Sequence, residues 1–205
     1  AILGGISLNY NSNFVPGNSD YLVVEADEYD RSFHHLHPNM AVVSSVDTDH
    51  LDIYGSEEKI KEAFQVFAQN MQKGAQLIKH YSDADFNTDV SVINYGMDNS
   101  SGPRVEHIYA QSGNLQFDLI LNDVELKGCL LKTGALHNVE NILSAALVAK
   151  FLGADPEKIK QAISSFEGVW RRFEWVFESD QLVYIDDYAH HPKEIDALIV
   201  SIKRL

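Results

Sequence analysis

The sequence predicts an α/β protein: a mostly parallel, wound sheet flanked by helices, with an added antiparallel β patch and the start of a second α/β domain. Three observations predict it. Short β-branched runs flank a long amphipathic helix in the first half of the chain. Three strand-like runs with little between them follow from about residue 103, and strands followed by a helix begin again after about residue 170.

The first two strands are predicted from short, almost continuous apolar runs. They are "YLVVEA" at 21–26 and "MAVVSSV" at 40–46, and runs of this kind are typical of buried parallel strands. Between them, "DRSFHHLH" predicts a short helix or turn closed by Pro38. A clear helix follows from about Ser56 to Gln72, with Ser56 as its cap. Its apolar side chains form one stripe, made of Ile60, Phe64, Phe67 and Met71.

Further strands are predicted on both sides of residue 103. "AQLIKH" and "DVSVINYG" come first, and the strand–helix–strand spacing predicts a wound α/β sheet. "RVEHIYAQ", "LQFDLIL" and "VELKGCLL" then predict the antiparallel patch, and Asn122-Asp123 predicts a tight turn between the last two.

Two helices and a second strand–helix pattern complete the chain. One helix is predicted from about His137 to Leu152, and the next has Asp155 as its N-cap and Pro156 at its first position. "EWVFE" and "LVYIDD" predict strands, and a helix begins near Pro192. We therefore predict a central domain over residues 1–169 and the beginning of a second, truncated domain over residues 170–205.

Composition excludes several classes of protein. The 205 residues include 16 Lys+Arg and 30 Asp+Glu, which gives a net charge of −14 and argues against nucleic acid or an anionic membrane as the main partner. A phosphate ligand stays possible because metal ions bridge acids to phosphates. No run approaches the ~20 apolar residues of a membrane span. Cys129 is predicted to be a buried strand thiol, which suits a reducing compartment.

The N-terminal stretch "AILGGISLNYNSNF" lacks a Met and a basic region. It is therefore not predicted to be a signal peptide, and it suggests a chain entered part-way.

Two acidic clusters follow the two predicted parallel strands. Ligands of open α/β sheets gather at the carboxyl ends of strands, and crowded carboxylates must be protonated, solvated or neutralised by a cation. Oxygen ligands with one imidazole suit Mg²⁺ or Mn²⁺ better than Zn²⁺. The alternative is a pair of solvated loops with incidental acids. The first cluster contains Glu25, Asp27, Glu28 and Asp30, and the second contains Asp47, Asp49, His50 and Asp52.

The helix opened by "GALHNVENILSAA" carries Asn138 and Asn141 on one face of its first turns. Asn amides can pair with the donors and acceptors of a base such as adenine, although Asn138 could instead be a simple cap. "RRFEW" places two adjacent guanidiniums, Arg171 and Arg172, which suit phosphate contacts or surface positions at a domain joint.

"YIDDYAHHPKE" has Asp187, His190 and His191 between a strand and a helix. This arrangement predicts a further site, unless His191 or a neighbour only caps that helix. The three histidines of "FHHLH" are interpreted as polar surface, because their spacing is not a convincing metal pattern. No G-x-x-x-x-G-K-[ST] phosphate loop occurs.

Taken together, the motifs resemble the ATP-dependent Mur ligases of peptidoglycan synthesis. The resemblance rests on six ordered stretches and covers nearly the whole chain: "GGISLNYNSN", "VVEADEYDRSFHHLHP", "SVDTDHLDIYG", "GALHNVENILSAA", "GVWRRFEW" and "DDYAHHPKE". It implies a central domain of P-loop-NTPase type and bacterial cytoplasmic location. It also implies an amide-forming ligase in which ATP phosphorylates the lactyl carboxylate of UDP-N-acetylmuramate and the amine of L-alanine attacks the acyl phosphate.

The resemblance also implies roles for single residues. Glu25 corresponds to the glutamate that binds the Mg²⁺ on the ATP phosphates, and His50 to the histidine that helps to hold a second metal. Asn138 and Asn141 correspond to the asparagines near the base. Arg172 matches the arginine that reaches the phosphates, and Asp187 matches the acid near the ribose. His190 and His191 are expected to shape the substrate cleft.

Departures from the family pattern lower the activity expected of this chain. The UDP-gripping domain, the phosphate loop and most of the C-terminal domain have no counterpart in the sequence. We therefore expect no turnover and at most weak nucleotide or metal binding by the chain alone. Three alternatives are a ligase for recycled murein tripeptide, a non-catalytic nucleotide- or metal-binding scaffold, and a metal-dependent hydrolase that uses both acidic clusters.

Overall fold

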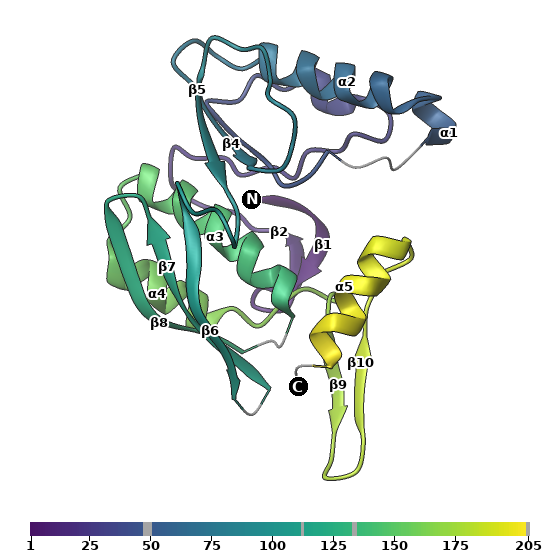
Figure 1. The fold of residues 1–205 in the computed structure, drawn as a ribbon, viewed down its shortest axis with the longest axis vertical. Helices are drawn as coiled ribbons and strands as arrows, with labels where there is room; N and C mark the ends of the chain where they lie inside the picture. The colour runs from purple at the N-terminus through teal and green to yellow at the C-terminus, as the bar shows by residue number, and fades with distance from the viewer. Residues whose placement is uncertain (47–50, 112, 133–134, 204–205) are drawn as a thin grey trace. The chain divides into compact units, whose positions relative to one another are not determined.

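A computed structural model of the 205 residues describes the chain except residues 47–50, 112, 133–134 and 204–205 (Figure 1). The chain divides into two compact units. Unit 1 contains residues 1–25 and 105–205, and unit 2 contains residues 26–104. Unit 2 is continuous in sequence, whereas unit 1 is assembled from both ends of the chain. The predicted boundary between residues 169 and 170 is not tested by this division and stays a prediction.

Unit 2 contains the predicted parallel sheet. Its strands are β3 (Met40–Val43), β4 (Gln76–His80) and β5 (Ser91–Tyr95), in that order. Helix α2 (Glu57–Gln69) covers the sheet, and Ser56 caps it by accepting a hydrogen bond from the Lys59 amide. Shorter helices are η1 (Ser32–His35) and α1 (Leu51–Tyr54).

The core of unit 2 forms between α2, η1 and the sheet. The predicted apolar stripe is buried, because Ile60, Phe67 and Met71 are buried and Phe64 packs against the same core. The helix ends at Gln69, earlier than the predicted Gln72, so Met71 lies just beyond it. The main contributors are Phe33, Val43, Ile60, Phe67 and Leu77.

Unit 1 contains the predicted antiparallel patch, with strands β6 (Arg104–Gln111), β7 (Asn114–Leu121) and β8 (Val124–Leu131) in that order. Leu121 pairs with Val124 across the predicted turn, where Asn122 has φ 60°. Every second side chain of β7 is buried, as expected for a sheet with one face in a core. Cys129 is buried in β8, and burial raises the pKa of its thiol to about 11.

Helices pack on this sheet as the sequence predicts. Helix α3 (Leu136–Phe151) lies against β7, and α4 (Pro156–Ser165) lies against β8. The Asp155 side chain caps α4 by accepting from the Glu157 amide at 2.9 Å, and Gly153 ends the preceding turn with φ 80°. These caps are local signals, which is why the helix boundaries were predictable.

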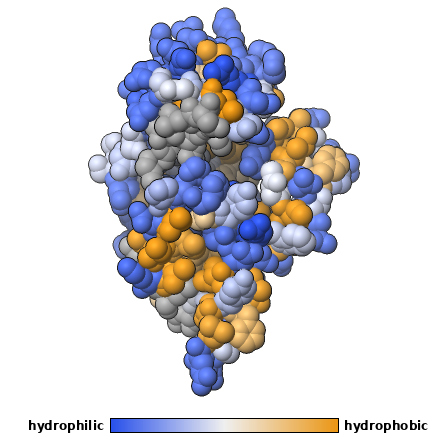
Figure 2. All heavy atoms as spheres, turned by 90° about the vertical axis from the view of Figure 1, so that its right-hand side faces the viewer, coloured by the Kyte–Doolittle hydropathy of each residue, from blue (hydrophilic) through white to orange (hydrophobic). Residues whose placement is uncertain are grey.

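The last part of unit 1 is a hairpin followed by a helix. Strands β9 (Glu174–Glu178) and β10 (Val183–Asp186) pair antiparallel, and α5 (Pro192–Ile202) follows (Figure 1). The hairpin exposes large apolar side chains, which gather on the lower part of the face in Figure 2. They include Val176, Phe177, Leu182, Val183 and Tyr184. None of the described helices is long and apolar enough to cross a membrane.

One predicted strand is wrong, and two strands were missed. Residues 21–26 form no strand, since Val24 makes a single parallel bridge with Ile2 and Leu22 is 70% exposed. The partner of that bridge is β1 (Ile2–Ser7), which also pairs with β2 (Ser12–Phe14). Two glycines in "ILGGIS" weaken its strand signal. The apolar run at 21–26 therefore lies beside one strand instead of inside a sheet.

Candidate functional site

Strand β1 of unit 1 is the backbone on which two predicted site segments meet. On one edge, the Ile2 amide donates to Val23 O at 2.9 Å and the Glu25 amide donates to Ile2 O at 3.0 Å. Farther along the same edge, Ser7 bridges Val169, and the Trp170 amide donates to Ile6 O at 3.0 Å. The acidic "EADEYD" and the "RRFEW" segments therefore begin on the same edge of β1, near its two ends, while β2 pairs with the other edge.

The two glycines of β1 allow this close approach. The Gly4 amide donates to a carboxylate oxygen of Glu25 at 2.7 Å. A Cβ at position 4 would lie 2.9 Å from the other oxygen of Glu25, and a Cβ at position 5 would lie 2.6 Å from Val169 Cγ1. Side chains at these positions would thus separate β1 from its neighbours.

The remaining acids of the first cluster are held by local turns. The Tyr29 amide donates to Asp27 Oδ1 at 2.9 Å, and the Ser32 amide donates to Asp30 Oδ1 at 2.8 Å. The hydroxyl and amide of Ser32 lower the pKa of the Asp30 carboxyl. Arg31 has φ 62° and stacks over the Tyr54 ring at 4.9 Å. Hydrogen bonds from backbone amides within the turn therefore stabilise some of the negative charges that the sequence places close together.

The predicted metal site cannot be assembled from what the structure describes. Three members of the second cluster, Asp47, Asp49 and His50, lie outside the described residues, so the pairing of His50 with Glu25 stays a prediction. Among the residues that are described, no group of three or more His, Cys, Asp or Glu side chains could hold a metal ion. Glu25 itself presents a hard oxygen donor of the kind that Mg²⁺ prefers.

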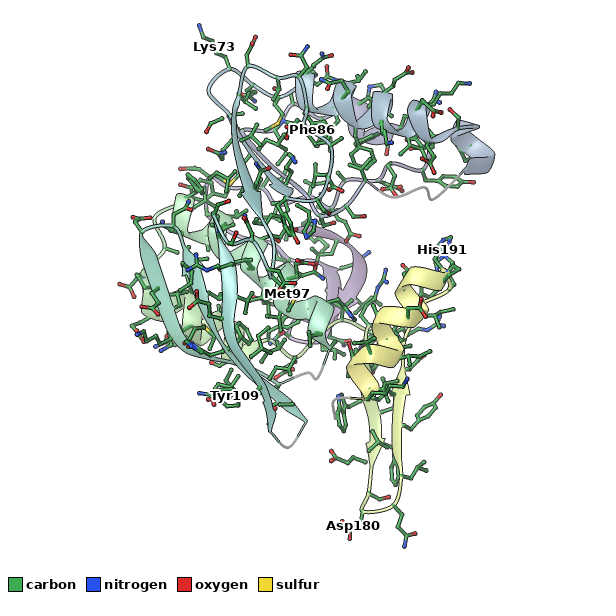
Figure 3. All side chains as sticks on the ribbon, viewed as in Figure 1. Lys73, Phe86, Met97, Tyr109, Asp180 and His191 are labelled. Carbon is green, nitrogen blue, oxygen red and sulfur yellow. The ribbon has the colours of Figure 1, made fainter. Side chains whose placement is uncertain are left out.

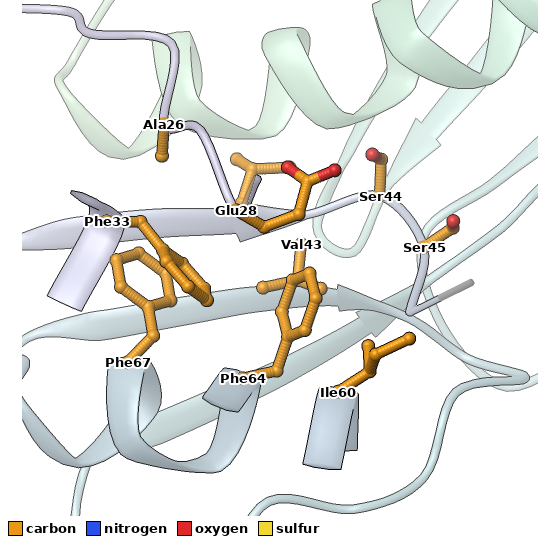
Figure 4. Close-up of a pocket in the computed structure, with 10 residues that line it drawn as sticks. Ala26, Glu28, Phe33, Val43, Ser44, Ser45, Ile60, Phe64 and Phe67 are labelled. Atoms are coloured by element: carbon orange, nitrogen blue, oxygen red, sulfur yellow. The ribbon is translucent and has the colours of Figure 1, made fainter. Parts of the chain in front are cut away.

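Unit 2 has a cavity of about 200 Å³ at the carboxyl end of β3. Its floor is aromatic, made by Phe33, Phe64 and Phe67, and Figure 4 shows Glu28 lying above these rings on the side of Ser44. The sequence placed a ligand site at this strand end but not the aromatic floor. The periodicity of α2 could have indicated the floor, because Phe64 and Phe67 share its apolar face.

The histidines of "FHHLH" are more than polar surface. His34 Nε2 lies 2.9 Å from Ala63 O, and His37 Nδ1 lies 2.9 Å from Asn70 O. Both rings therefore tie η1 and its following loop to α2, while His35 is exposed.

Asn138 and Asn141 lie in the first turns of α3, as predicted. Asn138 is half-buried and is not the cap, because the N-cap position is Ala135. Asn141 is exposed, and its carbonyl accepts from the Ser144 hydroxyl at 2.8 Å. The simple-cap alternative for Asn138 is therefore wrong.

The "RRFEW" segment is a tight turn with two residues in the left-handed region. Arg171 has φ 56° and Phe173 has φ 53°, an uncommon conformation for side chains of this size. Phe173 is only 1% exposed, whereas Arg172 between them is exposed. Burial of Phe173 thus fixes the turn that presents Arg172.

The "DDYAHHPKE" segment holds this turn from the other side. Asp187 accepts from the Phe173 amide through Oδ2 and from the Ala189 amide through Oδ1, both at 2.7 Å. The Tyr188 amide donates to Arg171 O at 2.8 Å. The guanidiniums of Arg171 and Arg172 lie 5.1 and 5.7 Å from the centre of the Tyr188 ring. The structure therefore brings Arg172 and Asp187 together.

His190 and His191 lie at the start of α5, where Figure 3 shows His191. His191 is the N-cap, and its amide and that of His190 donate to Glu194 Oε2 at 3.2 and 3.0 Å. Burial raises the pKa of Glu194, but these two amides outweigh it and the pKa is lowered. The capping alternative for His191 is thus supported by its position.

Sequence reasoning assigned no role to His137, which the structure places beside this turn. Its ring meets the Phe173 ring edge-on, with 6.5 Å between centres. Its Nδ1 is buried and has no hydrogen-bond partner among the described residues. The signal available in the sequence was only its position next to Asn138.

Comparison with known proteins agrees with these features. The family described as "Mur ligase middle domain" matches residues 5–149. UDP-N-acetylmuramate–L-alanine ligase of Porphyromonas gingivalis W83 is 41% identical over 100% of this chain and 46% of its own length. The same ligase of Flavobacterium johnsoniae is 38% identical over 100% of the chain and 44% of its own length. The chain spans about half the length of the curated relatives it matches.

Solved structures give the same result. The crystal structure of the UDP-N-acetylmuramate–alanine ligase from Thermotoga maritima matches 99% of this chain and 47% of its own, with a TM-score of 0.79 and 28% identity. A murein peptide ligase from Psychrobacter arcticus matches 89% of this chain and 40% of its own, with a TM-score of 0.60 and 27% identity. The chain therefore belongs to the Mur ligase family, whose middle domain it contains, and it is homologous to the UDP-N-acetylmuramate–L-alanine ligases.

Proposed function

We propose that this chain is part of an ATP-dependent ligase that joins L-alanine to UDP-N-acetylmuramate through an acyl phosphate in bacterial peptidoglycan synthesis. The observation that carries the proposal is the assembly in unit 1, where Asp187 and buried Phe173 hold the turn that presents Arg172 beside the first turn of α3. The 41% identity to an alanine-adding ligase over the whole chain supports the same choice of substrates.

In this proposal the nucleotide is bound by residues of unit 1. Asn138 and Asn141 face the base, and exposed Arg172 contacts the phosphates and stabilises charge on the phosphoryl group in transfer. Asp187 lies near the ribose. Its two oxygens already accept one backbone amide each, but a carboxylate has about four lone-pair sites, so a ribose hydroxyl can still donate to it.

The proposed metal ligands are Glu25 and His50. A bound Mg²⁺ or Mn²⁺ would neutralise charge on the phosphate oxygens. Glu25 contributes a carboxylate that β1 orients through the Gly4 amide. His190 and His191 are proposed to shape the substrate cleft from the start of α5, with His191 also capping that helix.

We further infer that residues 1–169 form the central domain and that residues 170–205 begin the C-terminal domain. The sequence contains no phosphate-loop motif, so the proposed nucleotide site is incomplete within this chain. We expect the 205-residue chain alone to be inactive, and we place the complete enzyme in the bacterial cytoplasm.

A chimera tests the proposal. Residues 1–205 replace the matched part of the Porphyromonas gingivalis ligase, and phosphate release is measured with ATP, UDP-N-acetylmuramate and L-alanine. We expect release that requires all three substrates and that falls by about 10²-fold or more in an Arg172→Ala chimera. A folded chimera that binds nucleotide without releasing phosphate would favour a non-catalytic scaffold instead.

The choice of acceptor needs a separate assay. The same chimera is given L-Ala-γ-D-Glu-meso-diaminopimelate in place of L-alanine. A preference for this tripeptide would favour the murein recycling ligase, to which the chain is also structurally similar. Phosphate release by the 205-residue chain alone would contradict the expectation that it is inactive.

A further inference from the structure

His137 lies where two elements of the proposed nucleotide site meet. It is the second residue of α3, one position before Asn138. Its ring packs edge-on against Phe173, which is only 1% exposed and directly follows Arg172. Edge-to-face contacts between rings are favourable and directional, so the contact limits how the Arg171–Phe173 turn can move against α3.

The turn needs such support because its backbone is strained. Residues with large side chains are strained at φ near +55°, and they persist there only when their surroundings hold them. Arg171 and Phe173 both have such angles. Asp187 holds the Phe173 amide on one side, and the His137 ring contacts the Phe173 ring on the other.

The charges that face His137 come from three segments. Asp187 follows β10, Arg172 precedes β9, and Glu194 lies in the first turn of α5. Burial lowers the pKa of the His137 imidazole, and the attraction of Asp187, which acts in the opposite direction, does not reverse this. The ring is therefore neutral at neutral pH and does not repel the Arg172 guanidinium.

We propose that His137 is a positioning residue, whose ring seats Phe173 and thereby fixes Arg172 relative to the asparagine-bearing first turn of α3. The inference rests on the proposed function in one respect, namely that Asn138 and Arg172 serve a single adenine nucleotide. The seating of Arg172 itself is a property of the unliganded chain and can be measured without any ligand.

Amide hydrogen exchange in the 205-residue chain tests whether the His137 ring holds Phe173 in place. In His137→Ala, we expect the Phe173 amide to exchange about threefold to tenfold faster, because one aromatic contact is lost. His137→Phe restores a ring at this position and should recover most of the protection. His35→Ala removes an exposed histidine in unit 2 and should change nothing at Phe173. Unchanged protection in His137→Ala would overturn the proposal.

A pH titration of the unaltered chain gives a second test that needs no substitution to fold. The Arg172 Nε–H signal is followed by NMR between pH 8 and 5. We expect one step with a midpoint below about 6.5, the ordinary histidine value, as His137 becomes cationic. That step should be absent in His137→Phe. If the step persists there, another group causes it, and His137 is not coupled to Arg172.

Binding of ATP with Mg²⁺ by the unaltered chain is measured separately by calorimetry. Failure to bind would count against the proposed function in this chain and would leave the exchange and titration results to decide on His137. If the chain binds, His137→Ala should weaken affinity and His137→Phe should restore it. Loss of affinity in His137→Phe with normal Phe173 protection would show that the imidazole contacts nucleotide directly, contrary to a positioning role.

Discussion

Glu25 and Asp187 are both acids in family motifs, but the structure holds them differently. Glu25 is exposed and, among the described residues, accepts one hydrogen bond, from the Gly4 amide. Asp187 is half-buried and accepts two, from the Phe173 and Ala189 amides. The difference teaches that an acid in a motif can either be available to bind a ligand or serve mainly to hold the backbone in place. The burial of the acid and the number of its hydrogen-bond partners distinguish these two roles.

The two glycines of β1 show the same contrast. Gly4 faces the end of a flexible Glu25 side chain, whereas Gly5 faces the branched Val169 close to the main chain. A new side chain at position 4 can push Glu25 aside, but one at position 5 must move a packed residue.

The largest effect is expected for Asp187→Ala. It removes the acceptor of two backbone amides and frees the strained Phe173, so we expect a loss of about 3 kcal/mol in the free energy of unfolding. Urea unfolding followed by Trp fluorescence measures it. The neighbouring Asp186→Ala removes a 3.5 Å ion pair with Arg171 and should cost about 0.5 kcal/mol. Equal losses in both variants would contradict a framing role for Asp187.

Gly5→Ala should have the next largest effect. The added methyl would lie 2.6 Å from Val169 Cγ1, so we expect a loss of about 1–3 kcal/mol in the free energy of unfolding. Val169→Ala should recover part of this loss in the double variant, giving a coupling that denaturant unfolding can measure. Gly4→Ala is the matched comparison and should cost less. A Gly4 variant as unstable as the Gly5 variant would show that Glu25 is as rigid as Val169.

Asp118 extends the comparison to the antiparallel sheet and gives a pH dependence. The Gly128 amide at 2.7 Å and His107 at 2.8 Å lower the pKa of this carboxyl. Since its folded pKa lies below the unfolded one, its contribution is present above about pH 4 and is lost as pH falls toward the folded pKa. Asp118→Asn should cost about 1 kcal/mol at pH 7, and the difference should shrink below pH 4. A difference that grows on acidification would be inconsistent with this origin.

Glu25→Gln should have the smallest effect on stability. The side chain is exposed and its amide oxygen can still accept from Gly4, so we expect a change within about 0.5 kcal/mol. In the chimera, however, Mg²⁺-dependent phosphate release should fall sharply, because a neutral amide is a poor ligand for a hard cation. A stable variant with unchanged metal dependence would remove Glu25 from the proposed metal site.

Much of the fold was predictable because its signals are local. Ser56 and the apolar stripe belong to α2, and Asp155 caps α4, so each of these signals lies within a few residues of its own helix. The strands β3 to β8 were predicted from short runs and one turn at Asn122. By contrast, β1 was missed because its glycines carry no strand signal. Glycine is needed there because residues 25 and 169, which are far away in the sequence, approach the strand closely.

The candidate site was predictable in its residues but not in its assembly. The motifs placed Arg172 and Asp187 at the ends of predicted elements, and the structure brings them together. The left-handed angles of Arg171 and Phe173 could not be predicted, because neither residue favours them and only tertiary contacts impose them. His137 was missed for the same reason, since its partner is 36 positions away.

The glycine at position 5 has an evolutionary consequence. The branched side chain of Val169 occupies the space that a side chain at position 5 would need. Substitutions at the two positions should therefore be correlated among relatives. Relatives that carry alanine or serine at the first position should carry a smaller residue at the second.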